Sequence, residues 1–451
     1  MAYPSAFGKE GTLNIHGSGM KKRRALLAGR ESSAAAASRR EQMLDAAAKH
    51  LNASGVSLTS LGDIAESLGV SRAALYQYVE DREDLVFQCY RRSCEAMARH
   101  LGEAIRLGTD AAEVIGIFID RMLDPAQPEI AARAEIAFLG PERHETIQGL
   151  YDAITTRLAH VLESGAQAGV LRACDRDVNA NAIISLVTWV PLSRYWAPPA
   201  QSYEPDRFVK ALKATLLDGL AADKGNPPQY RPIDLSPLLT RVGGVFDRDA
   251  MADAKRETLL AIASRLFNRK GIDSTSLEEI AGHVGATKRT LYHHLGDKQT
   301  LLVSCYARSY RIFLFIMHGM TAYKGPRLEA LAAAFHAIST VYLRDDLAPL
   351  APMVGHEALP PKAQAEMTPH ADALIAGYFG AMSLGKADKS LHVIDMEARV
   401  LLLPGTFSWL VKDTGTHGEA RIEHIAREIS ALLAMGLRCR VAGIAGVSLG
   451  T

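Results

Sequence analysis

The sequence predicts an all-α fold built from two tandem halves, and three observations support this prediction. Aromatic residues make up only 6% of the chain while Ala and Leu are abundant, a composition that favours helices. The stretch LGVSRAALYQYVEDREDL (68–85) returns as VGATKRTLYHHLGDKQTL (284–301), at a constant offset of 216 residues. Apart from short runs such as IISLVTWV, no alternating strand pattern persists. A chain of 451 residues has room for about three domains.

The composition also narrows the class of protein. The net charge is +1, so any basic surface must be local. No apolar run approaches the ~18 residues of a membrane span, and the short run ALLAG after Lys21–Arg24 ends at Arg30, too soon for a signal peptide. The cysteines are scattered, odd in number and without a C-x-x-C pair: Cys89, Cys94, Cys174, Cys305 and Cys439. We therefore expect a reduced, cytoplasmic protein with no disulfide framework, metal site or membrane partner.

The first segment, residues 1–37, is predicted to be a disordered basic arm. It is rich in Gly, Ser and Ala and lacks helical periodicity. Seven Lys and Arg side chains against Glu31 give residues 21–40 a net charge of +6. The structural alternative is a solvated tail.

The next segment, residues 38–93, is predicted to contain four helices. The first carries an apolar stripe and ends near Gly55. The second starts at Thr59 or Ser60 and ends in a sharp turn at Gly69. Ser71 can cap a very short third helix, and Asp81 caps a fourth. Two short helices joined by a tight turn that contains Gly are a helix-turn-helix, whose second helix can enter the major groove of DNA.

The second copy occupies residues 250–309 and keeps the same register without a gap from Arg256 to Ser309. Its second helix opens with Thr275-Ser276-Leu277-Glu278, which has the spacing of a capping box. The repeated frame predicts the same helix-turn-helix twice in one chain.

The remaining segments are predicted to be two helical bundles, residues 94–222 and 310–440. Between the halves, residues 223–249 contain four prolines and are predicted to be a linker, and residues 441–451 a tail. PLSRYW at 191–196 corresponds to PGTFSW at 404–409, so the whole half is duplicated.

The motif residues resemble the DNA-binding domain of the tetracycline-repressor (TetR) family of transcriptional regulators. The family pattern is present as Ile64-Ala65, Gly69-Val70-Ser71 and Leu75-Tyr76-Gln77-Tyr78-Val79, with the corresponding residues from Ile280 to Leu295. The resemblance covers about 50 residues of each half. The family usually has Phe where Val79 and Leu295 stand. Because family members are half this length and act as homodimers, the resemblance implies an internal pseudo-dimer in which the last helices, 207–222 and 421–437, pair with each other. It leaves further association of chains open.

The resemblance implies double-stranded operator DNA as a partner and assigns residues to it. The residues that would face bases are Ser71, Arg72, Ala73 and Gln77 in one head and Thr287, Lys288, Arg289 and His293 in the other. Those that would bind phosphate or anchor the backbone are Tyr76, Tyr78, Arg82, Tyr292, His294 and Lys298, with Ser60 and Ser276 at the starts of the second helices. The alternatives are half-buried core tyrosines and solvated charges near a helix start.

The resemblance also implies a small-molecule effector, bound in the helical bundles without a cofactor. The candidate ligand-binding residues are Phe138, His144, Tyr151, Trp189, Arg194, Trp196, His336, Tyr342, His356, Tyr378 and Phe407. Ordinary core packing is the alternative for each of them.

Enzyme motifs do not support catalysis. Gly446–Gly450 matches G-x-S-x-G but is followed by no helix, and His356-Glu357 lacks the second His of a zinc-protease motif. The resemblance to the TetR family implies a ligand-responsive regulator, a repressor, and the unlike readers of the two heads predict that it reads an asymmetric operator. The alternative is an interaction or sensor protein in which one or both heads no longer bind DNA.

Overall fold

The computed structural model describes residues 16–133, 135–196, 204–239, 248–283, 296–352, 359–412, 415 and 417–439, with side chains from Ala37 onward except those of Trp196 and 248–250. The described residues are helical, and their extended contacts are two isolated bridges rather than strands. The all-α prediction is confirmed.

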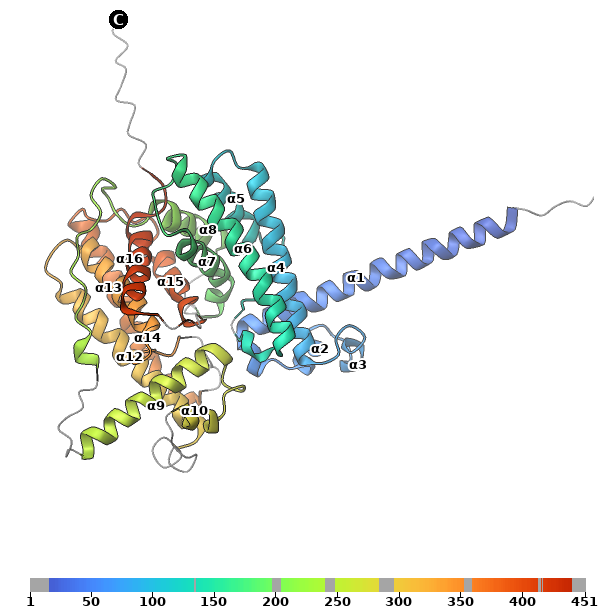
Figure 1. The fold of residues 1–451 in the computed structure, drawn as a ribbon. Coiled ribbons are helices and arrows are strands. Elements are labelled where there is room, and N and C mark those ends of the chain that lie inside the picture. The colour runs from blue at the N-terminus through green and yellow to red at the C-terminus, as the bar shows by residue number, and fades with distance from the viewer. Residues whose placement is uncertain are drawn as a thin grey trace, which may run out of the picture.

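The first half is a head followed by a body (Figure 1). The head contains α1 (His16–Leu58), α2 (Leu61–Ser67), α3 (Arg72–Leu75) and the start of α4 (Arg82–Leu107). The body contains the rest of α4, α5 (Ala111–Met122), η1 (Ile136–Phe138), α6 (Pro141–Gln167), α7 (Arg176–Trp196), α8 (Pro205–Lys213) and the π-helical turn η2 (Ala214–Asp218).

The second half repeats this order after a short turn, η3 (Ser236–Leu238). Its head contains α9 (Arg248–Lys270), α10 (Leu277–His283) and the start of α12 (Lys298–Ala322). Its body contains the rest of α12, α13 (Arg327–Leu343), α14 (Pro361–Ala387), α15 (Met396–Phe407), η5 (Leu410–Lys412) and α16 (Glu419–Met435). α12 is long and apolar enough to span a membrane, but half of its apolar window is buried and it packs against α9, α13 and α14 as a core helix.

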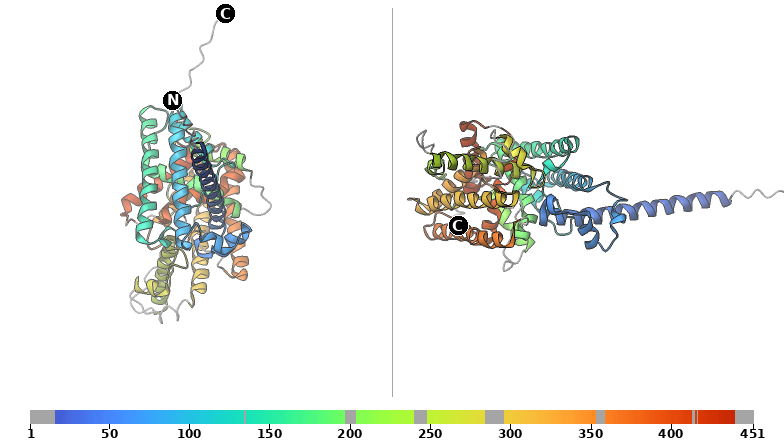
Figure 2. Two further views of the ribbon diagram at one scale, coloured as in Figure 1. Left: turned by 90° about the vertical axis from the view of Figure 1, so that its right-hand side faces the viewer. Right: turned by 90° about the horizontal axis from the view of Figure 1, so that it is seen from below.

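The arm differs from expectation between His16 and Ala37. These residues belong to α1, which projects away from the body in Figure 1 and in the right-hand view of Figure 2. The run of four alanines and the Lys, Arg and Leu residues around it have high helix propensity, so the helix continues toward the N-terminus beyond its packed part. At the other end the helix breaks at Gly55, which has a φ of 74°, where the apolar stripe predicted an end.

The halves meet through equivalent helices. α7 of the first half packs on both α15 and α16 of the second half, and α8 also packs on α15. These four helices form the centre of the molecule (Figure 1). Backbone hydrogen bonds repeat in both directions: Ala221 N–H donates to the carbonyl of Ala434 (2.8 Å), and Arg438 N–H donates to that of Leu217 (2.9 Å). Each bond is the image of the other under exchange of the halves, which is the pattern of a two-fold axis.

Ion pairs between the halves, and two glycines where the chains cross, are also related by exchange of the halves. Asp175, before α7, accepts from Arg421 of the other half at 3.0 Å, and Asp395, before α15, accepts from Arg207 at 2.6 Å. Where the chains cross, Gly219 and Gly436 have φ values of 62° and 69°, and a Cβ on either would lie 2.6 Å or less from the backbone nitrogen of the other. Only glycine fits both the left-handed conformation and this approach.

The join between head and body is also duplicated. Asn52 donates to the carbonyl of Ile130 (2.8 Å) and accepts from the N–H of Ala132 (2.8 Å). Asn268 makes the same pair of bonds to Pro349 (2.9 Å) and Ala351 (2.8 Å). We call each asparagine and its loop partners a clamp. Because Asn52 and Asn268 are both buried, each clamp holds the first helix of a head against the loop of its own body.

Candidate nucleic-acid interface and effector cavity

The helix-turn-helix of the first head is built as its sequence predicts. Ser60 caps α2 by accepting from Asp63 N–H (3.1 Å), and Ser71 caps α3 by accepting from Ala74 N–H (3.3 Å). The turn between them runs through Gly69, which has a φ of 64°, and Val70 N–H closes it on the carbonyl of Ala65 (3.0 Å). This turn directs α3 away from α2.

The first residues of α3 present their side chains to solvent. Leu75 and Val79 are buried and anchor the short helix. On the other side, the predicted base-facing residues are exposed: Ser71, Arg72, Ala73 and Gln77. Tyr76, which is predicted to bind a DNA phosphate, is exposed as well. Arg72 donates to the hydroxyl of Tyr76 (3.3 Å), which orients the guanidinium along the helix. This face of α3 is therefore accessible from solvent.

Tyr78 and Arg82 point back toward the protein. Tyr78 is half-buried against the core of the first half. Arg82 donates to the carbonyl of Ser57 (3.3 Å), and its guanidinium carbon lies 4.8 Å from the ring centre of Phe138. Lys298 takes the corresponding position in the second head, donating to the carbonyl of Asp273 at 3.4 Å. These two cations therefore brace their heads.

In the second head, the structure describes the helix before the turn and the helix after it. Ser276 caps α10 by accepting from Glu279 N–H at 3.0 Å, while Thr275 bonds back to the carbonyl of Gly271. The cap is therefore one residue later than the predicted capping box, because the buried Thr275 side chain satisfies the preceding turn. The predicted readers Thr287, Lys288, Arg289, Tyr292, His293 and His294 lie outside the described residues.

The two heads meet at a buried carboxylate. Glu135, in the first body, accepts from both the backbone N–H (3.1 Å) and the hydroxyl (2.9 Å) of Ser57. A Cβ placed on Gly271 of the second head would lie 2.6 Å from the same carboxyl group. Burial raises the pKa of Glu135; the bonds from Ser57 oppose this rise, and nearby Asp273 adds to it. One side chain of the first body thus contacts corresponding turns of both heads.

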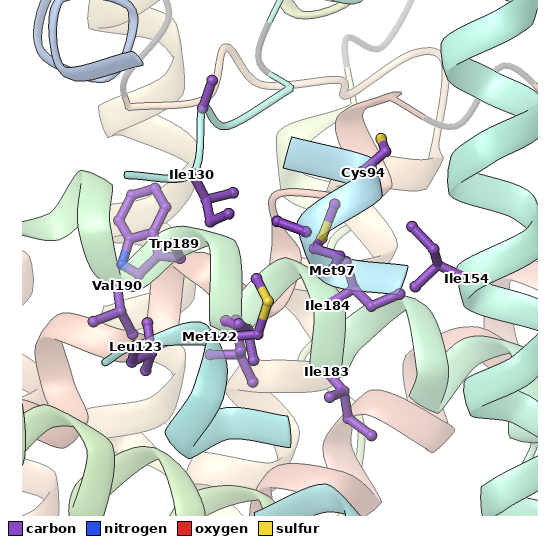
Figure 3. Packing of buried hydrophobic residues seen from close by; sticks show 14 of the residues in the cluster. Cys94, Met97, Met122, Leu123, Ile130, Ile154, Ile183, Ile184, Trp189 and Val190 are labelled. Carbon is purple, nitrogen blue, oxygen red and sulfur yellow. The ribbon is translucent and has the colours of Figure 1, made fainter. Parts of the chain in front are cut away.

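A cavity of about 720 Å³ opens between the first body and the second head. Its walls come from both halves: α4, α6 and α7 of the first, and α9, α10 and η5 of the second. Two of the lining residues, Cys94 and Met97 of α4, lie near the core residues Ile154 and Ile184, as the close view of the core packing in Figure 3 shows. Four Arg and Lys side chains also line the cavity: Arg133, Arg269, Lys270 and Lys412.

The predicted ligand residues divide among several places. His144 and Tyr151 line this cavity. Phe138 lies under Arg82, Trp189 donates to the carbonyl of Leu401 across the halves (2.8 Å), and Arg194 is paired with Glu129. In the second half, His336 contacts Glu423 (2.9 Å). The aromatic residues Tyr342, Tyr378 and Phe407 pack in the second core; His356 and the side chain of Trp196 lie outside the described residues.

Several lining residues were missed by sequence reasoning. Arg133 lies in a loop between α5 and η1, and Lys412 ends η5 in the other half. Neither stands in a motif or on a periodic apolar face, so no local pattern in the sequence marks it. The proline-rich junction after Met122 was the one hint that a functional loop precedes α6.

Comparison with known proteins identifies both helix-turn-helix segments and the first body. The model for bacterial regulatory proteins of the tetR family matches residues 43–89 and 259–305, and the tetracyclin repressor-like C-terminal domain model matches 112–220. The HTH-type transcriptional repressor KstR2 of Rhodococcus jostii (strain RHA1) is 25% identical over 187 residues, which are 40% of this chain and 90% of that protein. The HTH-type transcriptional regulator AcrR of Shigella flexneri is 44% identical over 50 residues, 11% of this chain and 23% of that one.

Among solved structures, the ketosteroid transcriptional regulator KstR2 of Mycobacterium tuberculosis is 18% identical and has a TM-score of 0.31, covering 38% of this chain and 89% of its own. The relatives named here are transcriptional regulators rather than enzymes, and the DNA-binding model matches at both copies of the helix-turn-helix. The chain is therefore a member of the tetR family of bacterial regulatory proteins, duplicated so that two TetR-like halves lie in one polypeptide.

Proposed function

We propose that the chain is a cytoplasmic, ligand-responsive transcriptional repressor in which the two halves act as an internal pseudo-dimer on one operator. The observation that carries the proposal is the exchange pattern at the centre, where Ala221–Ala434 has its image in Arg438–Leu217 and Asp175–Arg421 has its image in Asp395–Arg207. A homodimer makes each such contact twice through its symmetry. Here both copies come from one chain, so a single chain supplies two heads.

The proposed operator has two unlike half-sites about one helical turn apart. Support comes from the readers: Arg72 and Gln77 correspond to Lys288 and His293, whereas Gly69 and its counterpart keep the turn. Arg or Lys pairs with guanine and Gln with adenine, each contact worth roughly 1–3 kcal/mol of discrimination. A fused pair is free of the palindrome that a homodimer imposes.

Response to an effector would act through the spacing of the heads. The cavity touches the first body and α9–α10 of the second head, and Glu135 touches the turns of both heads. A ligand that favours one separation of these parts shifts the equilibrium between an operator-binding and a released arrangement, and DNA shifts ligand affinity reciprocally. The effector is a small molecule that this cavity can enclose.

The basic arm is proposed to assist DNA binding. Residues 60–81 of the first head contain one cation, Arg72, and four acids, a net charge of −3. Residues 21–40 carry +6 and lead directly into this head along α1. Deleting residues 1–37 should weaken binding and flatten its salt dependence, measured as the slope of log affinity against log salt. An unchanged slope would make the arm a solvated tail.

The decisive experiment selects binding sites for the purified chain from random DNA and tests Arg72→Ala and Lys288→Ala on the sequence recovered. We expect each variant to relax one half-site, the two being different, and sedimentation to show single chains of 48.8 kDa on one operator. A perfect palindrome would contradict unlike heads, a single half-site would mean that one head is out of use, and an obligate dimer of chains would contradict the internal pseudo-dimer. No selected site at all would favour an interaction protein.

A further inference from the structure

The cavity between the first body and the second head contains cations without acidic partners. The ion pairs among the described residues include neither Arg133 nor Lys412, although Lys270 at the same cavity pairs with Glu279 at 2.5 Å. Arg133 donates to Gln148 (2.7 Å), and its Nε is buried without a partner. Burial lowers the pKa of Lys412 to about 7, and nearby Arg133 lowers it as well. An anion placed here would replace lost solvation for both groups.

Polar side chains, Asp152 and the paired Glu279 among them, line part of the cavity, and the aromatic and apolar side chains near Arg133 favour a flat apolar body beside the anion. The guanidinium carbon of Arg133 lies 3.7 Å from the ring centre of Tyr151, so the planar cation is stacked and presents its edge. Met97, Ile136 and Trp409 line other sides of the cavity. Its volume of about 720 Å³ lies within the 300–1,000 Å³ typical of sites for drug-sized molecules.

The corresponding region of the second half is filled by aromatic side chains. Cys94 and Met97 of α4 correspond, at the offset of 216, to Tyr310 and Phe313 of α12. The ring of Tyr310 lies 5.6 Å from that of His370, and the ring of Phe313 lies 5.8 Å from that of Tyr342. Larger residues at the same helical positions occupy the space that Cys94 and Met97 leave open.

Building on the proposed regulator, we infer that the effector is an organic anion with a flat, apolar body, held by Arg133 and Lys412, and that one chain binds one such molecule. Its acidic group contacts a loop of the first body and the turn after α15 of the second, while its body touches α4 and the end of α9. A single molecule therefore joins two halves that would each hold its own ligand in a symmetric assembly.

Calorimetric titration of the full chain without DNA tests this, with naphthoate, naphthyl phosphate and naphthamide as probes of equal body and different charge. We expect one site per chain, and affinity for at least one of the two anions that exceeds that for the amide by about tenfold or more, the worth of a charge-assisted hydrogen bond. The better of the two anions distinguishes a carboxylate from a phosphate ligand. Two sites per chain, equal affinity for all three probes, or no binding at millimolar concentration would each overturn the inference.

Variants separate charge recognition from folding. Arg133→Gln and Lys412→Met should each weaken the anion by about ten- to a hundredfold and leave naphthamide unchanged. Cys94→Tyr with Met97→Phe, the residues of the second half, should abolish binding of all three probes, whereas Tyr310→Cys with Phe313→Met should leave the first site intact. Equal weakening of anion and amide by Arg133→Gln would mean that Arg133 only supports the wall, contrary to the inference.

Gel shifts with the selected operator, run without ligand, keep this inference distinct from the proposed function. Operator binding in a chain that takes up no probe would refute the anion site alone. One anion per chain in a protein that binds no operator would refute the regulator alone. Release of DNA by the anion, and not by naphthamide, is the result expected if both are correct.

Discussion

The two halves keep the same frame and differ in what fills it. Asn52 and Asn268 make the same pair of hydrogen bonds from the first helix of a head to the loop of its body. The cores of the bodies differ, because α4 presents Cys94 and Met97 where α12 presents Tyr310 and Phe313. The junctions are alike in the two halves, whereas a cavity lies beside Cys94 and Met97 and aromatic rings pack around Tyr310 and Phe313.

The interface carries this difference. A two-fold arrangement gives each half the same neighbours, so asymmetry must come from side chains rather than from the backbone. Lys412 of the second half faces the cavity of the first, so the half with the filled core contributes to the open one. Fusion into one chain permits such specialisation, because the two copies can mutate independently.

The largest effect is expected where the halves cross. Gly219→Ala would place a Cβ 2.4 Å from the nitrogen of Gly436 at a φ of 62°, so the backbones must separate. We expect a loss of about 3–5 kcal/mol in the free energy of unfolding, measured by urea denaturation. Gly436→Ala should cost the same, since the site is symmetric.

Gly169→Ala is the matched control, because its φ is 72° and nothing lies within 4 Å of the new Cβ. It should cost only the left-handed penalty of about 1–2 kcal/mol. If the control were as damaging as Gly219→Ala, conformation rather than the crossing of the halves would explain the effect.

Exchanging core residues between the two bodies should change stability by unequal amounts. Tyr310 is 8% exposed and packs among aromatic rings, so Tyr310→Cys should cost about 3 kcal/mol in the free energy of unfolding. Cys94→Tyr, the reciprocal change, adds volume beside an open cavity and should cost no more than about 1 kcal/mol. Equal costs for the two changes would show that the cavity wall cannot accept the larger ring.

The clamps should respond alike. Asn52→Ala leaves the N–H of Ala132 and the carbonyl of Ile130 buried without their partner, and Asn268→Ala does the same to Ala351 and Pro349. We expect each substitution to lower the free energy of unfolding by about 2 kcal/mol, with equal losses within error, as measured by thermal or urea unfolding. A large difference would mean that one head is held to its body by other contacts.

The smallest effect is expected at Glu135, which has contacts to both heads. Burial raises its pKa above the ordinary 4.5, so the folded protein keeps this proton to a higher pH than the unfolded chain. The stabilisation from the proton is complete below the unfolded pKa and is lost as pH rises through the folded one. The side chain in Glu135→Gln stays neutral at every pH. At pH 8 the free energy of unfolding of this variant should therefore exceed that of the wild type by on the order of 1 kcal/mol, and the difference should shrink toward pH 5.

Urea denaturation of Glu135→Gln and wild type across this pH range measures the difference. Glu113→Gln serves as the control, since Glu113 is exposed and its pKa is lowered by the hydroxyl and N–H of Thr109. A difference in the free energy of unfolding between wild type and Glu135→Gln that is constant at all pH values would show that the carboxyl group has the same pKa in the folded and unfolded states.

The first head was largely predictable from local signals. Gly69, Ser71 and Asp81 stand where a turn and two helix starts need them, and the structure confirms each one. Local rules were less reliable where tertiary contacts compete: Thr275 bonds to the preceding turn, which moves the cap to Ser276. In the cavity, His144 stood out as a polar residue among apolar ones, whereas no local signal connected it with residues of the other half.

The sequence by itself determined the helical class, the duplication and the repeated DNA-binding motif, because helix propensity, capping residues and a constant offset are properties of short segments. Only the tertiary structure decided that Arg133 and Lys412 share a cavity and that Glu135 lies between the heads. These contacts between residues of different halves depend on how α7 and α15 pack. Packing of this kind arises from the summed burial of many side chains along both helices, which no short stretch of sequence contains.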